Sequence, residues 1–172
     1  ILAELFESSN LFGVSDIKNL YLELENFVDS PSAQDDYDFL YDQIIGYGEL
    51  IATKIVSKYL LSQGIENQWI DARKFIITDS RHRDARVQWK ETEELIKSDL
   101  MPITKTNLVI TQGFIASGKS GETTTLGREG SDYSAAIFGS VLGADSITIW
   151  KDVAGVMNAD PKKFENAVLI PA

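Results

Sequence analysis

The sequence contains no cysteine and only one histidine, His82. Disulfides, thiolate metal sites and cysteine nucleophiles are therefore excluded, and so is any metal site built from several histidines. No apolar run approaches the roughly 18 residues that suggest a membrane span. The first residues carry acids where a signal peptide has a basic region. These absences predict a cytoplasmic protein without a membrane partner.

Basic residues are also scarce, because 16 lysines and arginines stand against 26 aspartates and glutamates. The resulting net charge of −10 at pH 7 argues against a nucleic-acid backbone as partner. It does not exclude a small anionic ligand, since a few local cations can override the global field. The last third of the chain holds five such cations: Lys119, Arg128, Lys151, Lys162 and Lys163.

The 172 residues suit one domain whose hydrophobic period changes along the chain. Residues 1–63 have helical periodicity, with Ser15 as a helix cap, a break at Ser30–Ser32, an interruption at Gly46–Gly48 and Gly64 as a terminator. Short strands are expected afterwards at 68–71, 75–78, 107–111 and 146–150, with helices at 89–97, before Pro102, and at 131–142. This alternation predicts an α/β domain with a mainly parallel sheet.

The segment Gly113–Ser120 fits the phosphate-binding pattern G-x-x-x-x-G-K-[ST] at every position and follows a predicted strand. That pattern requires a helix to begin at its end. Here Gly121 and three threonines follow, which make a poor first helical turn. We therefore expect a surface loop from about Gly113 to Gly130, and a phosphate-binding loop is the weaker alternative.

A second glycine-rich segment, Thr123–Tyr133, leads directly into a predicted helix. Its backbone N–H groups and the helix dipole can form an anion site, and Arg128 offers a bidentate fork for a carboxylate or phosphate. Ser131 and Asp132 can equally serve as simple helix caps. The residues alone leave these two interpretations evenly balanced.

The segment Ile147–Pro161 places Lys151 and Asp152 at the carboxyl end of a predicted strand. Ligands of open α/β sheets bind at that edge. Gly155 and the turn-forming residues 158–161 allow the chain to wrap closely around a flat ligand. The alternative is an ordinary exit from a strand into a loop.

Together these segments resemble the aspartate kinases of the amino acid kinase family. The resemblance lies in four stretches, in family order: Gly46–Leu50, Val109–Ile115, Thr123–Tyr133 and Trp150–Pro161. It implies a three-layer αβα sandwich with a mainly parallel sheet, truncated at both ends, so that residues 1–172 form part of a catalytic domain. It also implies phosphorylation of the L-aspartate side chain by ATP with Mg²⁺, on the pathway to lysine, threonine and methionine, and a homo-oligomeric parent.

The same resemblance implies a role for each matching residue. Glu49 would bind the substrate ammonium and Arg128 its α-carboxylate, so that both side chains face one pocket. Asp132 would organise the cations of the active site. The substrate pocket would be lined by Phe114, Thr125, Gly130 and Ser131, and ATP would be contacted by Lys151, Asp152, Met157 and Lys162.

This chemistry agrees with what the chain lacks. A side-chain carboxylate has a pKa of about 3.9 and is ionised at neutral pH, so it needs no general base. Catalysis then depends mostly on positioning and charge stabilisation. Asp132 is accordingly expected to orient a lysine or the substrate ammonium, not to abstract a proton.

The sequence departs from the family pattern in several places. The initial strand with Lys-Phe-Gly-Gly is absent, which predicts that the 172 residues alone have no kinase activity. Position 129 is Glu where glycine is usual, and Lys151, Met157 and Lys162 also differ from the common residues. The alternatives are another kinase of this fold, acting on glutamate or a nucleoside monophosphate, or a non-catalytic nucleotide-sensing domain.

Overall fold

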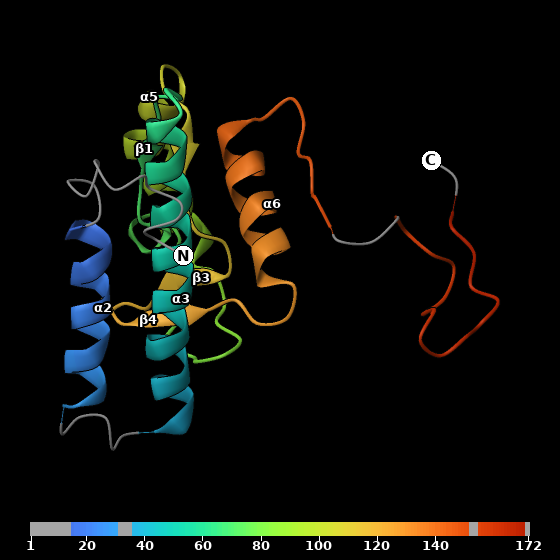
Figure 1. Ribbon diagram of the computed structural model, residues 1–172, viewed down its shortest axis with the longest axis horizontal. Helices are drawn as coiled ribbons and strands as arrows, with labels where there is room; N and C mark the ends of the chain where they lie inside the picture. Colours follow the sequence, from blue (N-terminus) through green and yellow to red (C-terminus); the bar gives the residue numbers. More distant parts are fainter. Residues whose placement is uncertain (1–14, 31–35, 152–154, 171–172) are drawn as a thin grey trace.

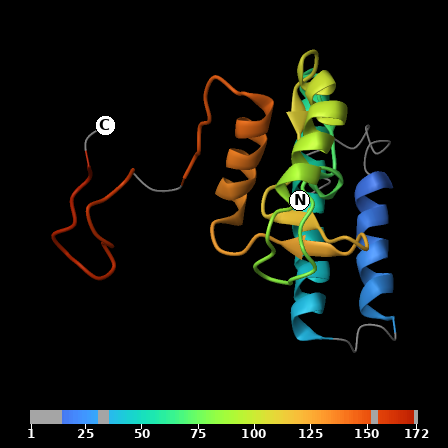
Figure 2. The ribbon, with the colours of Figure 1, turned by 180° about the vertical axis from the view of Figure 1, so that it is seen from behind.

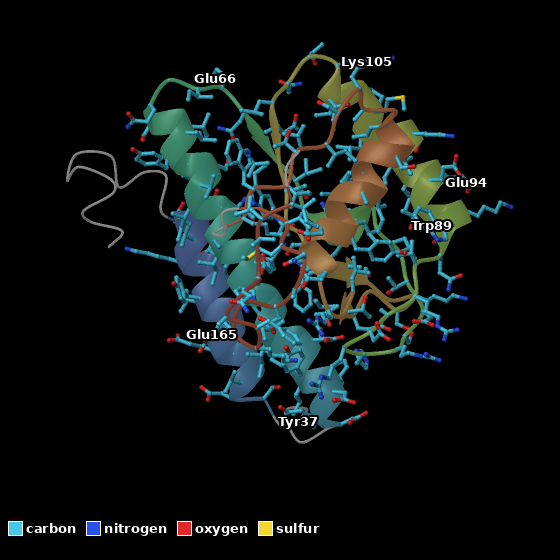
Figure 3. The ribbon with its side chains drawn as sticks, turned by 90° about the vertical axis from the view of Figure 1, so that its right-hand side faces the viewer. Tyr37, Glu66, Trp89, Glu94, Lys105 and Glu165 are labelled. Carbon is cyan, nitrogen blue, oxygen red and sulfur yellow. The ribbon has the colours of Figure 1, made fainter. Side chains whose placement is uncertain are left out.

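Two long helices form one side of the molecule in this computed structural model, which describes residues 15–30, 36–151 and 155–170. Helix α2 (Ser15–Val28) lies beside helix α3 (Tyr37–Ser62), and Ile17 is fully buried against the residues around Ile51 (Figure 1). Asp36 caps α3 by accepting a hydrogen bond from Asp38 N at 3.3 Å. The length of α3 is visible in Figure 3, where Tyr37 and Glu66 mark opposite ends of the molecule.

Helix α3 ends as the sequence predicts. Gly64 has a φ of +77°, a left-handed conformation that glycine adopts without strain. The predicted interruption at Gly46–Gly48 is wrong, because α3 runs through both glycines without a break. Glycine weakens a helix interior without forbidding it, and Gly46 has a packing purpose described below.

Short strands lie between α3 and the remaining helices. Strand β1 (Gln68–Trp69) pairs in parallel with β2 (Val109–Ile110), and β3 (Ile115–Ser117) pairs antiparallel with β4 (Thr123–Thr125). Helix α3 packs on β1, β2 and β4, while α6 (Gly130–Leu142) packs on β3 from the other side (Figure 2). The strands therefore form the middle layer between two helical layers.

A second helical stretch continues beyond its predicted end. Helix α4 (Trp89–Leu95) passes into the π-helical turn η4 (Ile96–Leu100) and then into α5 (Met101–Thr104). Pro102 lies in the first turn of α5, where a missing N–H is tolerated. The expected strand at 75–78 is replaced by the 3₁₀ helix η3 (Ala72–Lys74) and by single bridges at Ile77 and Thr78.

One apolar core joins these elements. Its fully buried side chains come from α3, η4, β3, α6 and the segment after η3: Leu50, Ile96, Ile115, Ile137 and Ile76. Each such side chain contributes about 1.5–3 kcal/mol by leaving water. The core thus ties the glycine-rich region to α3 and α6. Among the described residues, no helix has both the length and the apolar character needed to cross a bilayer.

Two predicted segments differ in the structure. The loop expected from Gly113 to Gly130 is largely the β3–β4 hairpin, since Thr124 and its neighbours pair with Ala116 and its neighbours. The strand expected at 146–150 is not formed, and Trp150 is 90% exposed. A strand needs a partner for its backbone groups, and residues 146–150 form no backbone hydrogen bond with any described residue.

Candidate functional site

One face of helix α3 forms the floor of the candidate site. Asp42, Gly46, Glu49 and Thr53 are spaced by four, three and four residues, which places them along a single stripe of the helix. Asp42 and Gly46 meet strand β4, while Thr53 Oγ1 accepts a hydrogen bond from Gln112 Nε2 at 2.8 Å. Glu49 therefore lies between the contact with β4 and the contact with the residue that precedes Gly113.

Gly46 permits this close approach between helix and hairpin. A Cβ at position 46 would lie 2.8 Å from Thr123 Cγ2, closer than real side chains come. The neighbouring Gln43 side chain holds the same threonine by its backbone, donating to Thr123 O at 2.7 Å and accepting from Thr123 N at 3.0 Å. Strand β4 is thus fastened to α3 along its length.

The first glycine-rich motif has a structural role in this arrangement. Residues Ile115–Ser117 form β3, and Gly118–Gly121 make the hairpin turn, with Gly118 N donating to Glu122 O at 2.9 Å. Because no helix begins at Ser120, the segment lacks the feature that a phosphate-binding loop requires. That alternative is wrong for this chain.

Three residues near the start of α6 have unusual backbone angles, one just before β3 and two in the turn from β4 into α6. Phe114, Gly127 and Glu129 have φ values of +70°, +74° and +55°. A non-glycine residue in this region is uncommon, so Glu129 has a backbone conformation that favours glycine. Gly130 follows, and a Cβ there would lie 2.5 Å from Phe114 Cδ2.

The first turn of α6 presents free donors. Phe114 N donates to Ser134 Oγ at 2.9 Å, which fixes the start of the helix against β3. The N–H groups of Ser131 and Asp132 have no acceptor in the part of the chain that the structure describes. An N-terminus with free N–H groups favours an anion, and Ser131 is exposed there. The predicted anion site therefore has a matching geometry.

Glu49 and Arg128 are the two charges that the sequence assigned to one pocket. Glu49 is half-buried on α3, and burial raises the pKa of its carboxyl group. No hydrogen bond or ion pair joins its carboxylate to any described residue. The side chain of Arg128 is 95% exposed, with its nearest acid, Glu129, at 4.0 Å. The two side chains form no ion pair with each other, so their placement in one pocket stays a prediction.

Two predicted residues from separate segments do meet. Lys151 Nζ lies 2.9 Å from Asp132 Oδ1 and 2.8 Å from Asp132 Oδ2, and it lies 3.5 Å from Glu129 Oε2. The hydrogen bond to Asp132 is the main cause of the raised pKa of Lys151. Asp132 therefore holds a cation at the N-terminus of α6, in line with its expected orienting role.

The other predicted nucleotide residues lie apart from this contact. Met157 pairs with Leu169 in a small bridge, and Lys162 is exposed in the turn that follows. This segment, 155–170, extends away from the α/β body in Figures 1 and 2. Asp152 lies outside the described residues. The structure thus brings Lys151 to the substrate segment but does not bring Met157 or Lys162 there.

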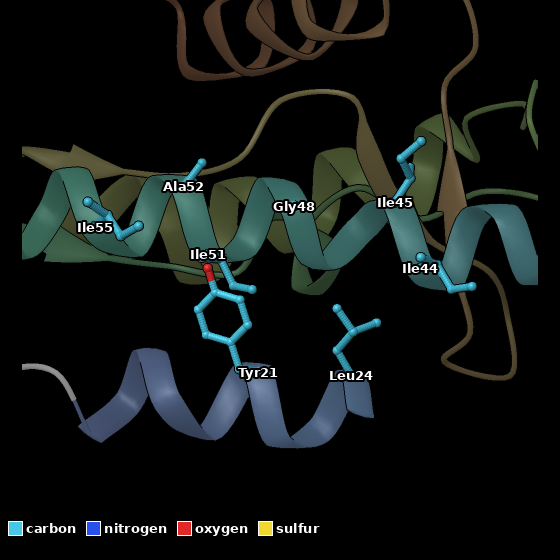
Figure 4. A pocket seen from close by; sticks show the side chains of 8 residues that line it. All are labelled: Tyr21, Leu24, Ile44, Ile45, Gly48, Ile51, Ala52 and Ile55. Carbon is cyan, nitrogen blue, oxygen red and sulfur yellow. The ribbon is translucent and has the colours of Figure 1, made fainter. Parts of the chain in front are cut away.

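The apolar hollow between α2 and α3 is a different kind of site. It measures about 460 Å³ and contains no charged residue in its lining, which consists of Tyr21, Leu24, Ile44, Ile45, Gly48, Ile51, Ala52 and Ile55 (Figure 4). A zwitterion needs charged partners when it leaves water. This hollow therefore does not suit a free amino acid. The described residues also contain no cluster of three acids or histidines that could hold a metal ion by itself.

Sequence comparison places these features in a known family. The model of the amino acid kinase family matches residues 5–172, and the chain belongs to that family. It is 37% identical over 158 residues to the bifunctional aspartokinase/homoserine dehydrogenase 2 of Escherichia coli (strain K12), covering 92% of this chain and 18% of that protein. It is 41% identical over 123 residues to the lysine-sensitive aspartokinase 3 of the same strain, covering 72% and 27%.

Solved structures agree with the sequence relatives. The chain superimposes on E. coli aspartokinase III in complex with aspartate and ADP, with a TM-score of 0.88 and 34% identity, covering 99% of this chain and 37% of that one. The same enzyme with lysine and aspartate gives a TM-score of 0.82. The predicted α/β fold of amino acid kinases is therefore confirmed, as is the resemblance to aspartokinases. The chain spans less than two fifths of the length of these proteins.

Sequence reasoning missed Asp42 and the segment 79–86. The basic residues Arg81, Arg83 and Arg86 are exposed, as is usual for a run of charges, yet His82 is largely covered and Ala85 is buried against β4. An acid at position 42 was a usable signal, because it lies on the same stripe of α3 as Gly46 and Glu49, seven residues before Glu49. Helical spacing alone does not tell a buried acid from an exposed one, so its partners had to be seen.

Proposed function

We propose that the chain is part of the catalytic domain of an aspartate kinase. In this reaction an oxygen of the L-aspartate side-chain carboxylate forms a bond to the γ-phosphorus of ATP. The bond between that phosphorus and the bridging oxygen breaks, and ADP leaves with the electron pair. The products are 4-phospho-L-aspartate and ADP, in the cytoplasm and on the route to lysine, threonine and methionine.

The half-buried carboxylate of Glu49 carries this proposal. It pays a desolvation penalty, seen as a raised pKa, and has no cation to offset it among the described residues. A free amino acid supplies such a cation in its α-ammonium group. The bound cation would return the pKa of Glu49 towards its usual value, because an opposite charge favours the ionised carboxylate.

The α-carboxylate of the same substrate would bind near the start of α6. Arg128 is exposed and offers a bidentate fork, and the N–H groups of Ser131 and Asp132 are free donors. Phe114, Gly130 and Ser131 would line this pocket. Thr125 has no exposed surface, and its hydroxyl group donates to Asp42, so it would contribute through its place in the hairpin.

The nucleotide would lie on the side of Lys151. The ammonium group of Lys151, which is held by Asp132, would stabilise charge on the transferring phosphoryl group. Asp152, Met157 and Lys162 would contact ATP when segment 155–170 lies against the nucleotide. Mg²⁺ normally enters such sites on the phosphates, with one or two carboxylates added, and Asp132 is the acid best placed for that.

The direct test is a substrate panel with the complete kinase that contains this chain. ADP formation should depend on L-aspartate, and hydroxylamine should trap the acyl phosphate as the aspartyl hydroxamate. Glu49→Gln keeps the shape of the side chain and removes its charge, so the KM for aspartate should rise at least tenfold while the KM for ATP stays within about twofold. Such a factor corresponds to about 1.4 kcal/mol.

Two outcomes would overturn the proposal. ADP formation with glutamate or a nucleoside monophosphate, but not with aspartate, would assign another kinase of this fold. Nucleotide binding without turnover of any of these substrates would indicate a nucleotide-sensing domain. The oligomeric state of the complete protein, which we expect to be a homo-oligomer, is measured separately by light scattering.

A further inference from the structure

A buried carboxylate in the first half of α3, that of Asp42, accepts hydrogen bonds from two distant segments of the described chain. It is fully buried. Asp42 Oδ2 accepts hydrogen bonds from Arg83 N at 2.9 Å, from Thr125 N at 3.0 Å and from His82 Nδ1 at 3.2 Å. Asp42 Oδ1 accepts from Thr125 Oγ1 at 2.7 Å. Four donors thus converge on one carboxylate, from two segments that lie about 40 and 83 residues further along the chain.

These two segments also hold each other. Ala85 N donates to Thr125 O at 2.9 Å. A Cβ at position 127 would lie 2.7 Å from Asp84 Oδ1 and 3.2 Å from Arg83 O, so only glycine fits there. Residues 125–127 are therefore enclosed between Asp42 on one side and residues 82–85 on the other. Arg128 is the next residue, and its backbone position follows from this enclosure.

A carboxylate is an unusual choice for this position. Its burial carries a desolvation cost that an apolar residue would avoid, and among the described residues no lysine or arginine side chain pairs with it. Its advantage is that it accepts hydrogen bonds at both oxygens and donates none. An amide would direct an N–H₂ group at one part of this ring of donors. The site thus suits a residue that holds two loops in a fixed position relative to each other.

We propose that Asp42 is a positioning residue for the binding of the amino-acid substrate. It acts by fixing Thr125 and residues 82–85 around the turn that carries Arg128. This inference rests on the proposed function, in which Arg128 binds the α-carboxylate. His82, on the edge of Phe39 with ring centroids 5.3 Å apart, closes the outer side of the cluster.

The test compares Asp42→Asn with Asp38→Asn in the complete kinase. Asp38 is a matched control, because it lies one helical turn earlier, is half-exposed, and pairs at 3.1 Å with the Arg83 side chain without touching β4. Asp42→Asn should raise the KM for aspartate at least tenfold and leave the KM for ATP within twofold. Asp38→Asn should change neither KM by more than twofold.

A purely structural role gives a different result. It would lower the amount of active enzyme, so that kcat falls while both KM values stay unchanged, and that pattern would overturn the proposal. Equal increases in the KM values for aspartate and ATP would overturn it as well. A wild-type enzyme that does not use aspartate would refute the proposed function, and the hydrogen-exchange measurement below then still decides whether Asp42 holds the turn.

Amide hydrogen exchange supplies a test that does not depend on turnover, and its measurement on the wild-type enzyme does not depend on the stability of a variant. In the wild-type enzyme, aspartate should slow exchange of the Arg83 and Thr125 N–H groups at least threefold, whereas ATP alone should not. In Asp42→Asn both amides should exchange at least tenfold faster than in Asp38→Asn. Unchanged exchange at these two amides under all of these conditions would overturn the proposal.

Discussion

The proposed substrate side of the molecule and the segment after α6 differ in how far their side chains are buried and satisfied by other parts of the chain. On the substrate side, α3, the β3–β4 hairpin and residues 79–86 satisfy each other's polar groups, and Thr123, Thr124 and Thr125 are all buried. After α6, apolar side chains face water: Trp150 is 90% exposed and Val156 is 74% exposed. Figures 1 and 2 show the same contrast between a packed body and an extended arm.

This difference indicates which contacts can contribute to the proposed binding of aspartate and of ATP. The substrate side is organised by contacts within the described chain, so its geometry exists before a ligand binds. The arm has few such contacts: Lys151 forms ion pairs with Asp132 and Glu129, and Ile147 lies against Gly139 of α6. We therefore expect mutations on the substrate side to act on aspartate or on stability, and mutations in the arm to act weakly on both.

The largest expected effect is that of Arg128→Ala in the complete kinase. The kcat/KM for aspartate should fall about 100-fold, because two charge-assisted hydrogen bonds are worth about 3 kcal/mol. The KM for ATP should stay within about threefold. Arg81→Ala removes an exposed arginine from the neighbouring loop and serves as the control. Equal losses of kcat/KM for aspartate and for ATP would contradict the assignment of the two substrates to separate regions.

A pair of glycine variants sharpens the packing side of the comparison. Gly46→Ala should lower the free energy of unfolding by about 1–2 kcal/mol, because its Cβ would press on Thr123 in a fastened strand. Gly48→Ala has open space around it and should raise stability by about 0.5–1 kcal/mol. Urea denaturation of both variants measures the difference, and equal midpoints would show that α3 and β4 do not pack as described.

Glu49→Gln should have a smaller effect on stability. It should raise the melting temperature, although the same change should weaken the binding of aspartate. Because burial raises the pKa of Glu49, the folded protein binds more protons than the unfolded chain between the two pKa values, and stability falls as pH rises through the folded value. At pH 7 the variant should melt higher by up to about 2 °C, since 1 kcal/mol shifts the Tm of a chain this size by roughly 2–4 °C.

A pH series checks the sign of that effect. The difference in Tm between the variant and the wild type should shrink as the pH falls through the raised pKa of Glu49, and it should vanish below the ordinary pKa of a glutamate, where the carboxyl group is protonated in both states. A difference that grows at low pH would mean that the Glu49 carboxylate has a stabilising partner in the folded protein.

The smallest expected effect belongs to the arm. Trp150→Ala should change the free energy of unfolding of the 172-residue chain by less than about 0.5 kcal/mol, because surface substitutions rarely do more. Ile115→Val, in the core, should cost about 0.5–1.5 kcal/mol. Thermal unfolding followed by circular dichroism compares the two variants. A larger loss for Trp150→Ala would mean that the arm packs on the body in solution.

The sequence predicted much of the helical structure and less of the strands. Helix α2, the left-handed Gly64 and helix α6 follow from caps and from apolar spacing, which are local properties. The prediction of a strand at 146–150 was wrong, although the apolar residues there favour one. Strand formation depends on a neighbouring strand that the local sequence does not specify. The hairpin at Gly113–Gly130 was missed for the related reason that glycine and threonine also suit loops.

The residues of the candidate site also fall into those that the sequence predicted and those that only the structure revealed. Its charges, Glu49 and Arg128, and its family motifs were evident from residue types and their order. Asp42 was not, because its role depends on donors that lie about 40 and 83 residues away along the chain. Lys151 and Asp132 were both predicted, yet their contact could be seen only in the structure.

The amino-acid sequence by itself determined the family, most of the helices and the charged residues that we propose to bind a ligand, because these follow from local spacing and residue chemistry. The tertiary structure alone decided that α3 runs unbroken past Gly46, that the first glycine motif is a hairpin, and that Asp42 gathers two distant loops. The physical reason is that a buried carboxylate or a close helix–strand contact is defined by its neighbours in space.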